Sequence, residues 1–418
     1  MRDAEFRFDT YPEILDALRH PDLSRSLDKR SFAEGNPRAG ILSLLHGDEH
    51  KMRRRMENAL FQRQALVRYE RDLFPGVLSE VLDRGEAGRT DLFELAGALS
   101  VVLAARRTGI DHDGTAEQLA ELFGYVTVIA QAAAIFDVVG DRDRVQRETI
   151  EVLERFDERY VRPSRRHRER ILDAIAAGEP DREAPHDLLT MALRRLRAED
   201  DTFADHGLLV REAGLFLHGG SHTSAQTVCN VFYHLFGLPD DQQRSWLRRV
   251  ADDLLAAQQC VHETVRLRPP NPELRRLAEL DAEVAGVPIR QGSRIVLDIR
   301  TANRDPALFG ARPGAFDPDR EIADGIPLWG LSFGVGAHIC IGRSVAGGLP
   351  LTGRTLRAGV PAAHLYGLVA LMVQAIAARG VAPDAERPPE LDRRTTRGTR
   401  WLRFPVLLPG GAPARMSP

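Results

Sequence analysis

Apolar residues recur at helical spacing through roughly the first two thirds of the chain. The pattern, together with the turn residues that interrupt it, predicts helices at 12–19, 49–61, 66–83, 92–107, 115–137, 142–175, from Asp187 onward, 206–236 and 243–268. The longest predicted helix, His206 to Phe236, ends at the turn signal Gly237-Leu238-Pro239. This part of the chain therefore predicts a helix-rich protein.

The pattern changes after Pro269-Pro270. The rest of the chain predicts short strands at 284–297, an irregular loop at 302–330, an amphipathic helix at Ala363–Arg379 and a strand at 399–408. No low-complexity linker divides the two parts. We therefore expect one domain over residues 1–418, with a helix-rich part at about 11–268 and a β and loop part at about 270–408.

Charge and cysteine content narrow the classes of partner. The net charge of −3 gives no general attraction for nucleic acid or a membrane surface, and we expect neither as a partner. The apolar run Leu95–Ala105 is too short to span a bilayer, and Met1–Glu5 lacks the apolar segment of a signal peptide. Three scattered cysteines suggest a reducing compartment and a cytoplasmic protein. Cys229 and Cys260 fall on apolar helical faces and are expected in the core.

The third cysteine, Cys340, stands in a glycine-framed segment, Phe333-Gly334-Val335-Gly336-Ala337-His338-Ile339-Cys340-Ile341-Gly342. Glycines allow a tight turn beneath a flat ligand and leave N–H groups free to point at sulfur, which should lower the thiol pKa. A thiolate on haem iron favours O–O cleavage. The segment resembles the haem-binding loop of the cytochrome P450 family. The resemblance implies a mainly α, triangular fold with small β-sheets, haem b as cofactor, Cys340 as axial iron ligand, and Phe333, Gly334 and Gly342 around the haem.

Further segments match the family. Glu263 and Arg266 share one helical face. Their position before Pro269-Pro270 resembles the Glu-x-x-Arg helix of the haem-thiolate proteins, which implies a structural lock onto an arginine further along, here Arg320. The segment Ala302–Pro306 also resembles the family pattern.

Haem carries two propionates, which need positive or N–H-donating partners. His50 and Arg54 are four residues apart on one helix face and match the family's His-x-x-x-Arg. Arg276 and His338 complete the set that the resemblance implies. Taken alone, His50 and Arg54 are also typical of an exposed basic helix face.

Oxygen chemistry is expected on the long helix, at Leu217–Ser224. Two glycines, Gly219 and Gly220, cost about 1 kcal/mol each inside a helix, so we expect their missing side chains to leave room above the haem. Thr223 is expected to donate to bound dioxygen, as in the family's threonine motif. Most members carry an acid where this chain has His222. An imidazole that titrates near neutrality can relay protons; alternatively His222 faces the core, and Thr223 or Ser224 carries protons through water.

The resemblance implies a monooxygenase that uses dioxygen and takes electrons from a separate ferredoxin and ferredoxin reductase. We expect a small apolar organic substrate, in secondary metabolism, in a pocket lined by residues near 25–45, 120–140, 217–224 and 271–274. One alternative is a haem-thiolate enzyme that performs phenol coupling, desaturation or peroxide-driven oxidation. Another is a haem-binding protein without turnover.

The sequence departs from the family in two places. The strand expected at Phe6–Phe8 lies close to residue 1, so the N-terminal strands of the family are expected to be incomplete or the start misassigned. A Gly-, Arg- and Pro-containing insertion occupies residues 347–361, where the family continues one helix. We expect it near the face where electron donors dock, with positive charge from Arg53, Arg55, Arg343 and Arg354; a solvated face is the alternative.

Overall fold

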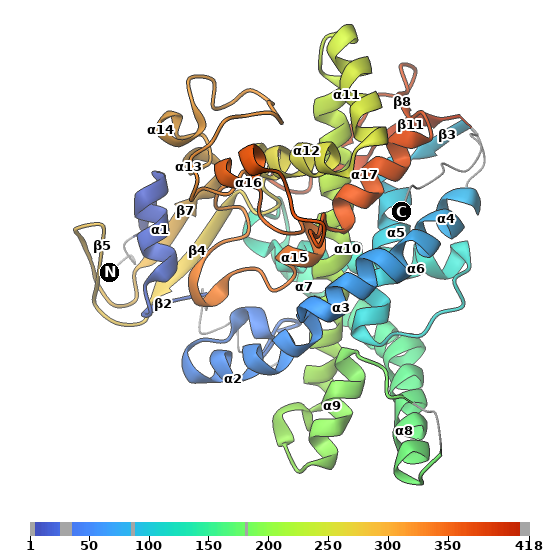
Figure 1. The fold of residues 1–418 in the computed structure, drawn as a ribbon. Helices are drawn as coiled ribbons and strands as arrows, with labels where there is room; N and C mark the ends of the chain where they lie inside the picture. Colours follow the sequence, from blue (N-terminus) through green and yellow to red (C-terminus); the bar gives the residue numbers. More distant parts are fainter. Residues whose placement is uncertain (1–4, 26–35, 85–87, 180–182, 410–418) are drawn as a thin grey trace.

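The computed structural model describes residues 5–25, 36–84, 88–179 and 183–409. Helices dominate its first two thirds and recur at shorter length towards the end (Figure 1). The helices are α1 (Tyr11–Arg19), α2 (Gly47–Asn58), α3 (Arg63–Arg68), α4 (Phe74–Arg84), α5 (Leu92–Thr108), α6 (Ala116–Ala133), α7 (Arg142–Phe156), α8 (Arg162–Ala176), α9 (Leu188–Arg197), α10 (His206–Phe236), α11 (Asp240–Asp252), α12 (Leu254–Leu267), α13 (Ile299–Ala302), α14 (Pro306–Phe309), α15 (Arg343–Ala346), α16 (Gly353–Ala358) and α17 (Leu368–Ala378).

Short strands form small sheets beside the helices. The strands are β1 (Glu5–Phe8), β2 (Leu23–Ser24), β3 (Gly88–Asp91), β4 (Glu273–Ala278), β5 (Ala282–Val284), β6 (Val287–Ile289), β7 (Arg294–Asp298), β8 (Ala382–Pro383), β9 (Glu390–Leu391), β10 (Trp401–Arg403) and β11 (Pro405–Leu408). One sheet has the order β1-β7-β4-β2, and another has the order β3-β11-β8. The expected mainly α fold with small sheets is confirmed, and the strand expected at Phe6–Phe8 is β1, which pairs in parallel with β7.

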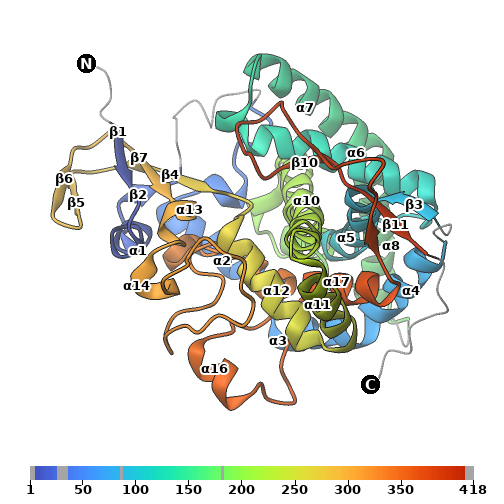
Figure 2. The ribbon, with the colours of Figure 1, turned by 90° about the horizontal axis from the view of Figure 1, so that it is seen from above.

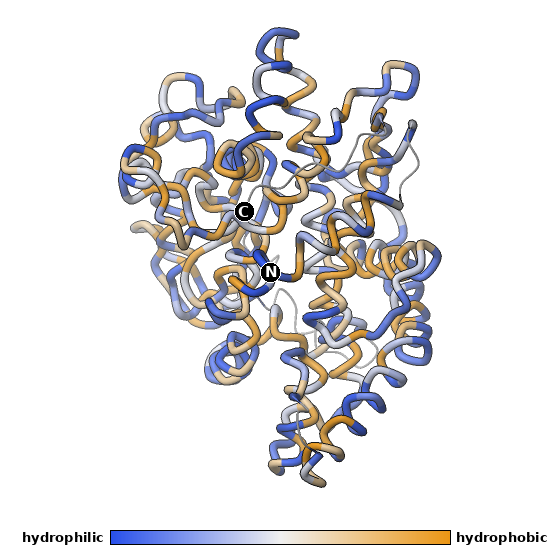
Figure 3. The backbone as a smooth tube through the Cα atoms, turned by 45° about the vertical axis from the view of Figure 1, so that its right-hand side comes forward, coloured by the Kyte–Doolittle hydropathy of each residue, from blue (hydrophilic) through white to orange (hydrophobic). Residues whose placement is uncertain are grey.

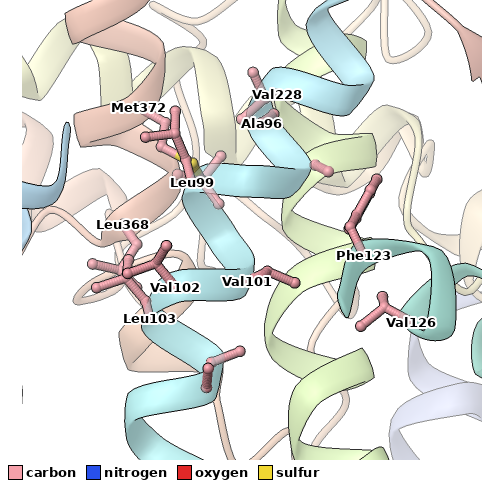
Figure 4. Close-up of a cluster of buried hydrophobic side chains, with 14 of the residues drawn as sticks. Ala96, Leu99, Val101, Val102, Leu103, Phe123, Val126, Val228, Leu368 and Met372 are labelled. Carbon is pink, nitrogen blue, oxygen red and sulfur yellow. The ribbon is translucent and has the colours of Figure 1, made fainter. Parts of the chain in front are cut away.

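The long helix α10 runs through the middle of the molecule, where it is seen end-on from above (Figure 2). Its N-terminus is capped by Asp205, whose carboxylate accepts from the backbone N–H of Gly207. The neighbouring α5 is buried along most of its length and contains the apolar run predicted from Leu95 to Ala105. Figure 4 shows side chains of α5 directed at α17, where Val102 and Leu103 lie near Leu368. These contacts make α5, α10 and α17 the core of the helical part.

Hydrophobic stretches gather on the central helices, and hydrophilic stretches are frequent on the outer loops (Figure 3). A second apolar cluster joins α1 to the sheet β1-β7-β4-β2 and to the loops that follow it. None of the helices in the described residues combines the length and apolar character needed to cross a bilayer. Cys229 and Cys260 are fully buried, as predicted.

The stretch predicted at 142–175 is helical throughout, because a π-helical turn at Asp157–Val161 joins α7 to α8. Two other predicted elements were wrong in detail. The stretch 243–268 divides at Asp253, whose carboxylate caps α12 through the N–H of Leu255. The predicted helix Ala363–Arg379 begins only at Leu368 and is buried on nearly every side rather than amphipathic. Its start is fixed by Gly367, which has φ +85° and lies so close to the 347–361 segment that a Cβ would stand 2.3 Å from the nitrogen of Gly348.

A buried charge cluster joins α2 to α10, and it corrects the prediction that Arg53 presents charge to a partner. Arg53 is 2% exposed, and its Nη2 lies 2.7 Å from Oε2 of Glu212 and 3.2 Å from Oε1 of Glu57. Glu212 also accepts from the backbone N–H of Leu42 at 3.0 Å. Burial and the nearby Glu212 raise the pKa of Glu57 well above its ordinary value of 4.5.

This cluster predicts a pH-dependent stability. A carboxyl group whose pKa is raised in the folded state contributes stability below its unfolded pKa, and this contribution is lost as the pH rises from there through the folded pKa. Each pKa unit of difference corresponds to about 1.4 kcal/mol. Glu57→Gln removes the titrating group. The melting temperature of the variant, measured relative to that of the wild type, should therefore rise between about pH 5 and pH 8. A difference in melting temperature that stays constant over this range would contradict the assignment.

Candidate functional site

A cavity of about 350 Å³ lies between α10, α5, α2 and the segment around Cys340. Cys340 is the one exposed cysteine of the three, and because it lines this cavity, its exposure is to the cavity. Each of the four stretches predicted to line a substrate pocket contributes residues to the cavity, as far as the described residues extend. The prediction missed Leu153 of α7, and it missed Leu215 and Phe216, which precede the predicted stretch on α10.

The cysteine loop is held by its own backbone. The N–H of Cys340 donates to the carbonyl oxygen of Phe333 at 2.8 Å, and the N–H of Gly342 donates to the Cys340 sulfur. Gly336 has φ +71°, and a Cβ on it would stand 2.5 Å from the carbonyl oxygen of Leu18. A glycine is therefore required where the loop crosses the end of α1.

Burial raises the pKa of the Cys340 thiol, and this outweighs the lowering by the Gly342 N–H and by Arg54. The backbone donor predicted to lower this pKa does so, but its effect is smaller than that of burial. The backbone amides reduce the free-energy cost of burying a thiolate at Cys340 but do not remove it. Coordination to a metal ion would supply the rest, because a coordinating thiol is deprotonated outright.

The predicted lock between Glu263, Arg266 and Arg320 is confirmed. Arg266 forms two hydrogen bonds to the Glu263 carboxylate, at 2.7 Å and 2.6 Å, and Arg320 reaches the same carboxylate at 3.1 Å and 3.2 Å. Arg266 also donates to the carbonyl oxygens of Asn303 and Pro313. The network thus fixes α12 against the loops that precede the cysteine segment.

Asn303, in the segment Ala302–Pro306, extends this network towards the cysteine loop. Its side chain donates to the carbonyl oxygen of Arg266 and to the Ser332 hydroxyl, and it accepts from the N–H of Leu331 at 2.8 Å. A Cβ at Gly330 would stand 2.2 Å from the Asn303 side-chain oxygen. The polar side chains of this region are therefore structural.

Two predicted propionate partners lie on α2. The Arg54 guanidinium donates to Asn58 at 3.0 Å and to the carbonyl oxygen of Ile339 at 2.7 Å, which ties α2 to the cysteine loop. His50 is 3% exposed, and its ring centroid is 4.1 Å from that of His338. Burial lowers the pKa of His50 to about 4. The alternative of an exposed basic helix face does not hold for His50.

The haem implied by the resemblance fits the donors around the cavity. Arg276 is 3% exposed on β4, and its guanidinium donates to the backbone oxygen of Arg275 and has no acidic partner in the described part of the chain. Burial lowers the pKa of Arg276 to about 9. His338 has a buried Nδ1 without a partner in the described residues, and its pKa is lowered, first by burial, so it acts as a neutral donor. An unpaired cation and an unpaired donor suit the oxygens of a carboxylate.

The two glycines of α10 have different surroundings. A Cβ on Gly219 would meet nothing within 4 Å, whereas a Cβ on Gly220 would stand 3.1 Å from the Cβ of Ala104 on α5. The prediction that both leave room over the haem therefore fits Gly219 only, and Gly220 serves the close approach of α5. Thr223 and Ser224 line the cavity, and each hydroxyl donates to a carbonyl oxygen one turn earlier, at 3.0 Å and 2.9 Å.

His222 lines a smaller side cavity of about 70 Å³ rather than the main one. It is 5% exposed, its ring meets the edge of Phe93, and its Nε2 has no partner in the described residues. Burial and then Arg400 lower its pKa well below 6.5, so the expectation that it titrates near neutrality was wrong. His218, one turn earlier, was not predicted as a site residue, and it lines both cavities together with Thr223. Its four-residue spacing from His222 was the available signal.

The insertion 347–361 interrupts the helix after the cysteine loop, since α15 ends at Ala346. It is tied to α12 by Gln258, which donates to the carbonyl oxygens of Gly347 and Leu349, and by His262, which contacts the oxygen of Gly347 at 2.7 Å. The side chains of Arg55 and Arg354 are exposed, and that of Arg343 is partly exposed.

Comparisons with known proteins agree with this geometry. The protein-family model "Cytochrome P450" matches residues 117–347. The chain is 26% identical to cyclooctat-9-en-7-ol 5-monooxygenase of Streptomyces melanosporofaciens over 366 residues, 78% of this chain and 75% of that one. It is 34% identical to 6-deoxyerythronolide B hydroxylase of Saccharopolyspora erythraea over 176 residues, 42% of this chain and 40% of that one.

Solved structures show the same fold. The crystal structure of CalO2 superposes with a TM-score of 0.71 at 22% identity and covers 97% of this chain and 91% of that one. The family match spans more than half of the chain and includes the cysteine loop, the Glu263 lock and the long helix. The chain therefore belongs to the cytochrome P450 family of haem-thiolate proteins and is one of its monooxygenases.

Proposed function

We propose that this chain, with haem b bound through Cys340, oxidises a small and largely apolar organic molecule of secondary metabolism. The observation that carries the proposal is that one cavity is lined by Cys340, by Gly219 and Thr223 of α10, and by several apolar side chains. The bound haem would supply activation of dioxygen. Electrons would come from a separate ferredoxin and ferredoxin reductase, for which Arg55, Arg343 and Arg354 offer positive charge.

The residues of the chain have separate tasks in this proposal. His50, Arg54, Arg276 and His338 would hold the propionates, and Cys340, in the Phe333–Gly342 loop with its three glycines, would hold the iron. Thr223 and Ser224 present hydroxyl groups to the cavity and pass protons. Unpaired cysteines suit a reducing environment, and we place the enzyme in the cytoplasm.

Thr223→Ala tests the oxygen site. The variant should keep consuming NADPH with substrate and redox partners present, because the haem loop is unchanged. The fraction of electrons recovered in product should fall roughly tenfold or more, since the hydroxyl that passes protons is gone. The measurement is the ratio of product formed to NADPH consumed. Thr223→Ser retains the hydroxyl and should keep most of this ratio; an unchanged ratio in Thr223→Ala would show that oxygen is handled elsewhere.

A second candidate function is a non-hydroxylating or peroxide-driven oxidation: phenol coupling, desaturation or use of peroxide. It is favoured by one observation: His222, which replaces the usual acid, is held neutral in the side cavity and not at the main one. The two candidates differ in their products and oxidant. If peroxide alone gives the same product as dioxygen with the redox partners, and faster, the second candidate holds.

A further inference from the structure

The cavity that we assign to substrate has an unusual charge balance. Six arginines line it: Arg25, Arg38, Arg54, Arg107, Arg211 and Arg276. Within the described part of the chain, no aspartate or glutamate lines it. A cation buried away from water needs an anion or aromatic cover nearby, because its loss of hydration is costly. Each arginine therefore needs an identified counterpart.

Five of the six have one. Arg54 and Arg276 face the haem loop, and Arg25 lies beside them, where Cys340 acts on its pKa. The two propionates of a bound haem would be shared by these three cations, since the charge of the Cys340 thiolate is offset by the iron that it binds. Arg107 is covered by the rings of Phe61 and Tyr69, at 4.7 Å and 4.5 Å.

Arg211 forms an ion pair with Asp205 at 3.1 Å and donates to the carbonyl oxygen of Ala39. Arg38 is left. Its contact is a 3.4 Å hydrogen bond to the carbonyl oxygen of Ala132, at the end of α6. The described residues give it no acidic partner.

The charged groups that act on Arg38 are also cations. Burial, then Arg25 and Arg397, lower the pKa of Arg38 to about 10. Arg38 in turn acts on the pKa of His218, a neutral imidazole that lines the same cavity. Arg397 is itself paired with Asp137 at 2.7 Å, so that carboxylate already has a partner.

We propose that the substrate carries a carboxylate, which pairs with Arg38 and hydrogen-bonds to His218 while its apolar part lies along Leu215 and Phe216. This rests on the proposed function, since it takes the cavity as the substrate site. The guanidinium fork matches a carboxylate in two parallel hydrogen bonds. One arginine beside a neutral imidazole balances a single negative charge, which favours a carboxylate over a doubly charged phosphate. Arg38 thereby selects the substrate and fixes which end lies beside Gly219 and Thr223.

The test compares carboxylic acids with their methyl esters on the haem-loaded enzyme. Three pairs of different shape serve as probes: dodecanoic acid, biphenyl-4-carboxylic acid and 1-adamantaneacetic acid, each with its ester. Binding is measured by calorimetry and by the shift of the haem spectrum. At least one acid should bind about tenfold or more tightly than its ester, the effect expected of a charge-assisted pair. If every ester binds as well as its acid, the proposal is overturned.

Variants locate the effect. Arg38→Gln should bring acid and ester to equal affinity, and Arg38→Lys should retain part of the preference. Arg211→Gln is the matched control, because it removes another cavity arginine that already has a partner, and it should keep the preference. A preference that survives Arg38→Gln, or an Arg38→Gln enzyme that loses haem instead, would place the anion elsewhere and contradict the proposal. Failure of this proposal can be told apart from failure of the proposed function. If the proposed function is wrong, the wild-type protein lacks the thiolate-type spectrum. The preference for acids over esters is measured independently, by calorimetry.

Discussion

Cys340→Ser should yield a folded protein that has lost the red-shifted Soret band of the reduced carbon monoxide complex, the spectroscopic mark of thiolate-ligated haem. The side chain faces the cavity and does not pack in either apolar cluster, so the exchange of sulfur for oxygen leaves the core intact. An alcohol ionises far less readily than a thiol and is a harder ligand for iron. Product formation should fall below detection, because the electron donation that favours O–O cleavage comes from the thiolate.

The matched control is Cys229→Ala, which removes a cysteine that is fully buried in α10. Burial raises the pKa of the Cys229 thiol well above 9.0, so this group is held neutral and is no competitor for iron. The variant should keep the band, with some loss of thermal stability from the small cavity that it creates. If the band survives in Cys340→Ser, the iron ligand is another residue.

Sequence patterns were sufficient where the determinants are local. The helix predicted at His206–Phe236 has the same bounds in the structure, because Asp205 caps one end and Gly237-Leu238-Pro239 terminates the other. The lock of Glu263 on Arg266 was readable for the same reason, since three residues on a helix bring two side chains together. Arg320, 57 residues from Glu263, was identified from the resemblance and not from spacing.

Residues whose partners are distant in sequence were misread. The strongly polar helix α2 has no apolar stripe to mark its inner face, so Arg53 looked exposed; its partner Glu212 lies 159 residues away. The strand β3 was missed because it is a four-residue segment, and it pairs with β11 near the other end of the chain. The start of α17 depends on the contact of Gly367 with Gly348. Arg38 lines the cavity without an acidic partner among the described residues, and the order of residues along the chain does not reveal this.

Glu263→Gln should be among the most damaging substitutions outside the haem loop. Glu263 is fully buried, and its carboxylate is shared by two buried guanidinium groups. Neutralising it leaves two cations without a counter-charge and removes acceptor capacity that they use. Breaking a buried ion pair from one side costs about 3–5 kcal/mol, a large share of the roughly 5–15 kcal/mol that holds a typical domain folded.

The control is Asp319→Asn, which breaks the ion pair with Arg249. Both of these side chains are about half exposed, so this pair should contribute less than about 1 kcal/mol. Haem content per protein and thermal unfolding of the two variants are the measurements. Glu263→Gln should be recovered in low yield with little haem, whereas Asp319→Asn should resemble the wild type. Equal stability of the two would mean that the lock is dispensable, and the loops before Cys340 would then have to be held by the Asn303 contacts alone.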